Sequence, residues 1–152
     1  MRHVHRAEPL SAAIGDLAEA EIDAVVALWR ACGLTRPWND PFADARLALA
    51  NESSTILALR ERAALLAAAM VGVDGHRGYV YYLAVDPAAR RRGLGRAIMR
   101  ACEDWIVARG HPKLHLFVRA DNAAVLAFYN TLGYQIEETH LLGKRFDGRQ
   151  RS

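Results

Sequence analysis

The chain has few of the features that mark secreted and membrane proteins. Among its 152 residues there are only two cysteines, Cys32 and Cys102, which lie far apart in apolar stretches with helical periodicity. This placement favours two small core residues in a reducing compartment over a disulfide. Apolar runs stop well short of a membrane span, and the N-terminus lacks the apolar centre of a signal peptide. We therefore expect a cytoplasmic protein with no membrane partner.

Patterns typical of metal sites and nucleic-acid-binding surfaces are also missing. The six histidines and two cysteines show no spacing typical of zinc ligands, so no metal site is predicted. The formal net charge is +3, a mild excess that includes the arginine cluster at 90–92 and 96. No broad basic face with interleaved aromatic residues accompanies this cluster, so a nucleic-acid partner is not expected. The excess suits an anionic cofactor instead.

Periodicity and turn residues predict a single domain over residues 1–152 that combines strands and helices. The length is sufficient for one core, and residues 1–9 form a polar, unpatterned N-terminal extension. The expected strands cover 10–17, 55–61, 64–73, 79–85, 113–118 and 134–142, and the expected helices cover 19–32, 41–50, 94–109 and 122–132. A run of strands followed by alternating strands and helices indicates an α/β layer with an antiparallel first half. The strands on either side of the central helix should run parallel.

The stretch from Arg90 to Ala97 is the most informative part of the chain. The apolar run Tyr79–Val85 leads through the turn Asp86-Pro87 into this loop, which opens the central helix. Glycines allow the backbone to turn sharply and approach a ligand, and the first N–H groups of a helix have no partner within it. The helix dipole and the flanking arginines add positive potential. Together they predict a site for a phosphate or pyrophosphate.

Three known glycine-rich loops could hold such a ligand. The P-loop requires a lysine followed by a hydroxyl residue, which this stretch lacks, and the dinucleotide fingerprint requires a third glycine where Ile98 stands. A third pattern, Arg-x-x-Gly-x-Gly after a strand, fits Arg90, Gly93 and Gly95 without a mismatch. In this respect the chain resembles the GCN5-related N-acetyltransferase (GNAT) superfamily, whose loop binds the pyrophosphate of acetyl-CoA.

A second stretch supports the resemblance. Asn122 leads a helical segment that contains Tyr129 and ends in Leu-Gly133-Tyr, which is similar to the second GNAT signature. Segments 36–41 and 74–78 resemble a bacterial subgroup of the YpeA type. The resemblance covers roughly residues 10–144. It implies the GNAT fold, a mixed, mostly antiparallel sheet of six to seven strands with about four flanking helices and splayed parallel strands at the cofactor site.

The resemblance also implies an activity. It predicts an acetyl-CoA-dependent N-acetyltransferase that moves an acetyl group to a primary amine by direct attack in a ternary complex. The alternative is a non-catalytic acyl-CoA-binding module. The acceptor stays open between a peptide amine, at an N-terminus or a lysine, and a small molecule, and a homodimer stays open as well.

Candidate cofactor contacts follow from matching the two signatures residue by residue. They are Leu83, Ala84, Val85, Arg90, Arg91, Arg92, Gly93, Leu94, Gly95, Arg96, Ala97, Asn122 and Tyr129. Any one of these arginines could equally be a solvated surface charge. Asn122 is also a good helix cap. Tyr129 is the candidate general acid, because a phenol with a pKa of about 10 stays protonated when it meets a thiolate whose thiol has a pKa near 8.5.

The general base and the acceptor site have weaker signals. Many relatives carry a glutamate on or just before the strand that enters the loop, but here the matching region offers Asp74 and His76, which could equally be a turn aspartate and an exposed histidine. In the family the segment between the first two helices forms a wall of the acceptor site. Candidates for the acceptor site are Arg36, Trp38, Asn39, Asp40 and Tyr81. Asp40 could instead cap a helix, and Trp38 could be core. Tyr81 and its neighbour Tyr82 should face opposite sides of their strand.

Overall fold

The computed structural model describes residues 13–149, and its centre is a five-stranded sheet in the order β1-β2-β3-β4-β5. The strands are β1 (Ala13–Asp16), β2 (Ser54–Glu61), β3 (Ala64–Val73), β4 (Gly78–Val85) and β5 (Leu114–Leu116). The first four pair antiparallel and β4 pairs parallel with β5. The mixed, mostly antiparallel sheet is confirmed, but with five strands instead of six to seven. The N-terminal extension and residues 10–12 of the first expected strand lie outside the described residues.

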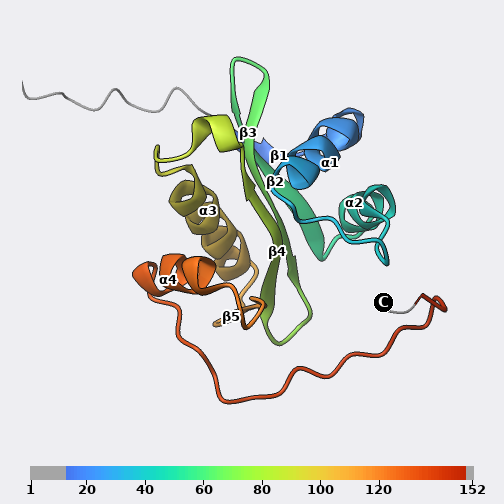
Figure 1. Ribbon diagram of the computed structural model, residues 1–152, viewed down its shortest axis with the longest axis vertical. Helices are drawn as coiled ribbons and strands as arrows, with labels where there is room; N and C mark the ends of the chain where they lie inside the picture. Colours follow the sequence, from blue (N-terminus) through green and yellow to red (C-terminus); the bar gives the residue numbers. More distant parts are fainter. Residues whose placement is uncertain (1–12, 150–152) are drawn as a thin grey trace, which may run out of the picture.

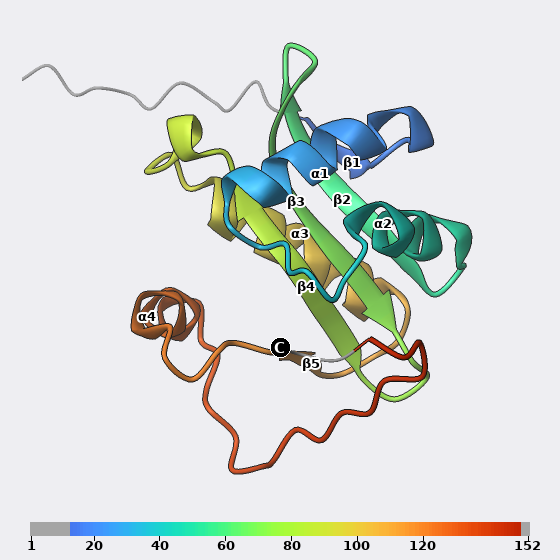
Figure 2. The same ribbon diagram turned by 45° about the vertical axis from the view of Figure 1, so that its right-hand side comes forward.

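Four helices cover the two faces of the sheet, as predicted. They are α1 (Ile22–Ala31), α2 (Pro41–Ala50), α3 (Leu94–Ala108) and α4 (Ala123–Thr131), with short 3-10 turns at Glu19–Glu21 and Pro87–Ala89. Figure 1 shows α1 and α2 on one side of the sheet and α3 and α4 on the other, and Figure 2 shows α1 and α2 in front of the strands. No helix within residues 13–149 is both long and apolar enough to cross a bilayer.

Each face of the sheet has its own apolar core. The buried stripe of α3 packs on one face, and α1 supplies a second cluster with Trp29 at its centre on the other. The α3 stripe comprises Leu94, Ile98, Met99, Cys102 and Ile106. Gly78 allows the end of α3 to lie close to β4, because a Cβ there would come 2.5 Å from the Ile106 side chain. The two cores fix β4 between α3 and α1.

The parallel strands β4 and β5 separate soon after they meet. They pair only from Gly78 to Val80 on β4, whereas β4 continues for five more residues. Just beyond this point the register with β3 shifts, so that Tyr82 and Leu83 lie opposite Ala69, and Tyr82 has a φ of 53°. A bulge of this kind bends a strand and strengthens its twist. The predicted splay of the parallel strands is therefore confirmed.

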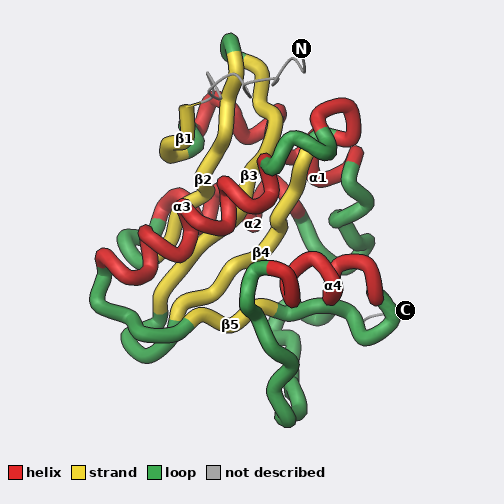
Figure 3. The backbone as a smooth tube through the Cα atoms, turned by 90° about the vertical axis from the view of Figure 1, so that its left-hand side faces the viewer, coloured by secondary structure: helices red, strands yellow, loops and turns green. Residues whose placement is uncertain are grey.

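The predicted last strand, 134–142, is wrong. This segment has no strand in the structure, and Ile136 and Leu142 are largely exposed. It is fastened to β5 through side chains, since Glu137 pairs with both Lys113 and His115. These side-chain contacts are not accompanied by a backbone ladder between the segment and β5. Figure 3 shows the segment as a loop that extends away from the sheet.

Candidate functional site

The loop between β4 and α3 holds several backbone N–H groups away from other partners. Arg91 and Gly93 have φ values of 65° and 74°, and the residue between them does not share this left-handed conformation. Alternation of this kind turns successive N–H groups into a concavity that binds anions. The Ala97 N–H donates to the Gly93 carbonyl in the first turn of α3, so the N–H groups of 94–96 precede the helical ladder. The buried side chain of Leu94 anchors this end of the helix.

The four arginines of the loop region differ in their partners. All are exposed, but only Arg92 forms an ion pair, at 2.6 Å from Glu61 at the end of β2. The hydrogen bond from Arg92 lowers the pKa of Glu61. Arg90, Arg91 and Arg96 form no ion pair with any residue of 13–149, so their charges are available to an anion. Arg92 is therefore placed to hold the loop against the β2–β3 hairpin.

Beyond the splay, β4 presents an open backbone edge. The Asp86 N–H donates to the Leu66 carbonyl of β3, so the alternation of an antiparallel ladder turns the backbone groups of Leu83 and Val85 to the other side. The thiol of Cys32 donates to the Val85 carbonyl at 3.2 Å, while the Ala84 side chain is buried toward α1. An extended ligand can pair with this edge as an added strand.

Helix α4 places Tyr129 next to the loop. Asn122 caps the helix through a bond from the Val125 N–H at 3.2 Å, as expected. A Cβ built on Gly95 would lie 3.2 Å from the Phe128 ring, so the start of α3 touches α4. Tyr129 is buried, which raises the pKa of its phenol to about 12, whereas Phe128, favoured by local composition as the core residue, is less buried. The loop and Tyr129 are thus brought together.

A cleft of about 950 Å³ opens between β5, α4 and the segment that follows α4. Tyr129 lines this cleft together with Leu116, Phe117 and Leu126. None of residues 90–97 lines this cleft, so the cleft and the anion loop are separate spaces. Helix α4 borders both, because its residue Tyr129 lines the cleft and its residue Phe128 contacts the start of α3. A ligand that reaches from the loop along β4 would arrive close to the Tyr129 ring.

The predicted acceptor residues lie on the α1–α2 side of the sheet. The Arg36 guanidinium donates to the carbonyls of Gly33 and Thr35 at 2.8 and 2.9 Å, which folds its own loop. Asp40 caps α2, since its carboxylate accepts from the N–H groups of Phe42 and Ala43. Both side chains have local structural partners. Asn39 and Trp38 are instead held by the C-terminal segment, through Arg145.

The prediction that Tyr81 and Tyr82 face opposite sides of β4 is wrong. Tyr81 pairs with Met70, which packs in the α1–α2 core, and Tyr82 stacks on Trp29 of α1 with ring centroids 4.0 Å apart. The bulge inserts an extra residue and cancels the alternation. The Tyr82 hydroxyl donates to the Asp44 carboxylate of α2 at 2.7 Å. Burial of the Tyr82 ring and this hydrogen bond both raise the pKa of Tyr82. Local sequence offered no signal for this bulge.

Tyr81 belongs to an exposed aromatic cluster with Tyr79 and Phe117. The rings of Tyr81 and Phe117 have centroids 5.8 Å apart and are close to parallel, and both residues are more than two-fifths exposed. The cluster spans β4 and the chain just beyond β5, on the same face of the sheet as Tyr82. Of these three aromatic residues, the sequence predicts only Tyr81 for the acceptor site.

The comparisons with known proteins agree with this geometry. The model of the acetyltransferase (GNAT) family matches residues 22–134. An acetyltransferase of Yersinia enterocolitica is 41% identical over 127 residues, which cover 84% of this chain and 90% of the relative. One of Pectobacterium atrosepticum is 42% identical over 125 residues, covering 82% and 89%. This chain belongs to the GNAT family.

Solved structures show the same fold. The ribosomal-protein-S18-alanine N-acetyltransferase from Escherichia coli is 28% identical with a TM-score of 0.70, over 80% of this chain and 76% of that one. The enzyme AAC(6')-Iy, solved with a bisubstrate analogue of CoA, has a TM-score of 0.75 at 14% identity, over 88% and 97%. The protein is an N-acetyltransferase whose acetyl donor is acetyl-CoA. The free N–H groups of the loop and its unpaired arginines fit the pyrophosphate of this cofactor.

Asp74 and His76 lie before the start of β4, away from the anion loop, although a hydrogen bond links Asp74 to Tyr79, whose ring stacks on Tyr81. Asp74 accepts from the N–H groups of Arg77 and His76 at 2.7 and 2.8 Å, and these bonds lower its pKa. Both residues precede β4, whereas the loop follows it, and the eight residues of that strand span roughly 25 Å. The structure therefore does not bring them to the loop. No cluster of three or more potential metal ligands occurs among residues 13–149.

Proposed function

We propose that this acetyltransferase acetylates a primary amine by direct attack in a ternary complex. The observation that carries the proposal is the splayed end of β4, which offers an open backbone edge, leads into the anion loop and packs against the same apolar core as Tyr129. Bound acetyl-CoA supplies an acetyl group that is activated as a thioester. The remaining tasks fall to the chain, which must hold the donor, receive the amine and deliver a proton to the departing sulfur.

The loop is the proposed pyrophosphate site. The N–H groups of residues 91–96 face the anion, with the charges of Arg90, Arg91 and Arg96 around them, while the Ala97 N–H already donates to Gly93. Leu94 contributes its backbone only, because its side chain is buried. The backbone of Leu83–Val85 then holds the pantetheine arm as an added strand. Asn122 keeps its amide group free to contact the cofactor, because its cap uses only the side-chain oxygen.

Tyr129 is the proposed proton donor to the thiolate. Its pKa of about 12 keeps the phenol protonated at every physiological pH, so that its O–H can donate a hydrogen bond to the sulfur as negative charge develops there. Burial among apolar rings holds the side chain in one place, with the Phe128 and Tyr134 rings 5.2 and 5.6 Å away. Position and protonation state both suit a general acid.

The acceptor enters on the α1–α2 face, next to Tyr81 and the 36–40 loop. Because two backbone N–H groups engage the Asp74 carboxylate and lower its pKa, this group is a weak base, and we assign deprotonation of the amine to solvent, which favours amines of low pKa. At pH 7 an α-amino group with a pKa near 7.8 is roughly 15% neutral, whereas a lysine side chain near 10.4 is roughly 0.04% neutral. An α-amine of a peptide is therefore the acceptor that the site suits best.

The test is turnover of acetyl-CoA with matched amines. Thiol release should be measured with peptides that have a free N-terminus and with N-terminally blocked peptides that contain lysine, and the site of acetylation should be located by mass spectrometry. We expect faster turnover for the free N-terminus, by about 300- to 400-fold at pH 7, from the difference in neutral fraction. Equal rates for the two peptides would contradict the α-amine assignment. If neither peptide caused thiol release from acetyl-CoA, the result would contradict acetylation of amines.

A further inference from the structure

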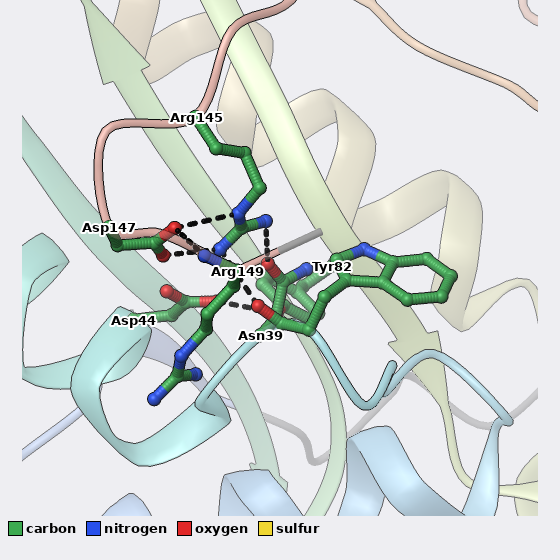
Figure 4. Close-up of polar contacts among 7 residues, drawn as sticks. Asn39, Asp44, Tyr82, Arg145, Asp147 and Arg149 are labelled. Carbon is green, nitrogen blue, oxygen red and sulfur yellow. Dashed lines mark hydrogen bonds and ion pairs between the residues drawn. The ribbon is translucent and has the colours of Figure 1, made fainter. Parts of the chain in front are cut away.

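The C-terminal segment crosses from the α4 side of the molecule to the α2 side and ends on the acceptor wall (Figure 1). There the Arg145 guanidinium donates to the Trp38 carbonyl at 2.7 Å and to Asn39 Oδ1 at 3.1 Å. Figure 4 shows this arginine above Asn39, Tyr82 and Asp44. A residue more than a hundred positions away thus makes two directed contacts with the segment that leads into α2.

We propose that Trp38, Asn39 and Asp44 form a binding site for a guanidinium group, which Arg145 occupies and for which an arginine of a peptide acceptor competes. The inference rests on the proposed function, because it names a second feature of the same acceptor. A planar guanidinium has five donors in a fixed fork and suits a wall that offers a carbonyl, an amide oxygen and a carboxylate.

The charge of the wall comes from Asp44. Its carboxylate accepts from the Tyr82 hydroxyl at 2.7 Å, which holds it on the surface that faces Arg145. Asp147, through its hydrogen bonds, and then Asp44, through its charge, raise the pKa of Arg145. Asp147 lies on the same segment as Arg145, two positions away, so it moves with the arginine. Asp44 remains on α2 when Arg145 leaves, and its negative charge can then attract another cation.

Arg145 can leave this site at low cost. The side chains of the segment around it contribute little packing, since Phe146 is 91% exposed and the Arg145 side chain is 34% exposed. Exposed ion pairs contribute little to stability, and segments with few buried contacts open readily. A tethered group competes with an effective concentration in the millimolar range, which a substrate of moderate affinity can overcome.

The site adjoins the place of the reaction. Tyr82, which holds Asp44, stands in the β4 bulge directly before the open edge at Leu83–Val85. Its ring packs on Trp29 of α1, so the wall and the edge belong to one rigid unit. If the arginine of a peptide acceptor binds at Asn39 and Asp44, only a few residues of the peptide are therefore needed for its N-terminal amine to reach that edge.

The experiment compares peptides that differ only in charge. Tetrapeptide amides with a free glycine N-terminus carry arginine at the second, third or fourth position, and each has a twin with neutral citrulline. Wild-type protein should acetylate the best arginine peptide with a kcat/KM at least about tenfold above that of its twin, as expected for one charge-assisted contact. Arg145→Ala should lower the KM of that arginine peptide by about three- to tenfold and leave the twin within about twofold.

Two further variants distinguish an effect of the guanidinium site from a general effect of charge on the C-terminal segment. Lys144→Ala removes the same charge from the same segment but no contact with the wall, and it should change neither peptide. Asp44→Asn keeps an oxygen for the Tyr82 hydroxyl and removes the charge, and it should reduce the preference for arginine to below about threefold. Equal rates for the twins in wild-type and Arg145→Ala proteins would overturn the inference. An equal rise in KM for both peptides in Arg145→Ala would also overturn it, because Arg145 would then only support the loop.

Direct binding distinguishes failure of the inference from failure of the proposed function. N-acetylarginine amide has no amine to acetylate and can be titrated into Arg145→Ala protein while NMR shifts are followed. Millimolar binding that Asp44→Asn abolishes would support the guanidinium site even if no amine were acetylated. Absence of binding would overturn the inference even if every peptide were acetylated.

Discussion

The proposed cofactor side and the proposed acceptor side of this GNAT domain are built in different ways. The cofactor side consists mostly of backbone from one continuous stretch, β4 to α3, with Leu94 buried beneath it and α4 beside it. The acceptor side consists of side chains from separate segments, namely Trp38 and Asn39, Asp44, Tyr82 and Arg145. A backbone site needs only glycine and a helix start, whereas a side-chain site depends on which residues the fold brings together.

This difference predicts that the two sides respond separately to substitution. Changes in the loop should act on acetyl-CoA and leave the acceptor unaffected. Changes around Asp44 should act on the acceptor and leave acetyl-CoA unaffected. Tyr129, which lies where the two sides meet, should affect turnover more than either affinity.

Gly95→Asp should have the largest effect. The structure directs a Cβ at this position toward Phe128 and Val85, at the entrance to the open edge. A carboxylate there would repel the pyrophosphate and obstruct the pantetheine path, and we expect CoA affinity to fall by at least about a hundredfold in calorimetry. Gly95→Ala should cost less than about tenfold, because the Phe128 ring need move only slightly.

A surface variant tests the same point without a packing change. Arg96 is exposed at the first turn of α3, so Arg96→Glu reverses a charge and leaves the core unaltered. We expect CoA affinity to fall by about tenfold or more, with an unchanged melting temperature and an unchanged acceptor KM. Normal CoA affinity in both Gly95→Asp and Arg96→Glu would refute the placement of the pyrophosphate.

Tyr129→Phe should lower kcat by about ten- to a thousandfold and leave acetyl-CoA affinity within about twofold. The substitution removes the hydroxyl and keeps the ring that packs against Phe128 and Tyr134. Some activity should remain, because proximity of the bound reactants is preserved. Tyr134→Phe is the matched control and should turn over like the parent. Equal kcat in the Tyr129 variant, with the chemical step shown to limit the rate, would remove the residue from the mechanism.

Tyr82→Phe should have a moderate effect that is confined to the acceptor side. It breaks the 2.7 Å bond to Asp44 but keeps the stacking on Trp29. We expect a three- to tenfold rise in acceptor KM, an unchanged KM for acetyl-CoA and a loss of about 1 kcal/mol in the free energy of unfolding. Tyr79→Phe serves as a control on the same strand. A rise in the acetyl-CoA KM alone would show that the two sides are not separate.

The smallest effect is expected in the alkaline pH profile. Burial raises the pKa of Tyr129 from 10 to about 12, so kcat measured with a saturating, fully neutral acceptor should fall by only about a hundredth at pH 10. A phenol with its ordinary pKa would halve the rate at that pH. The raised pKa also means that its contribution to stability is complete below pH 10 and is lost as pH rises toward 12. An alkaline limb near pH 10 in kcat would argue that another group is the acid.

Much of the fold followed from local patterns. The four helices, the hairpins and the loop after β4 were predicted close to their observed limits, because caps, turns and apolar periodicity are short-range features. The Asn122 and Asp40 caps were predicted from single residues and are observed. The strand at 134–142 was not found: the segment contacts Lys113 and His115 only through the Glu137 side chain, and strand pairing is a long-range contact that no local pattern fixes.

The same distinction between local and long-range features applies to the candidate site. The sequence by itself determined the anion loop, because glycine conformations and a helix start are properties of a few consecutive residues, and it determined the position of Tyr129 one helix later. Only the tertiary structure decided the acceptor side. The β4 bulge places Tyr82 on the same face as Tyr81, and the C-terminal segment brings Arg145 to Asn39. The bulge depends on how β4 pairs with β3, and the Arg145 contact joins residues 106 positions apart, so both depend on how the packed layers meet and not on any local pattern.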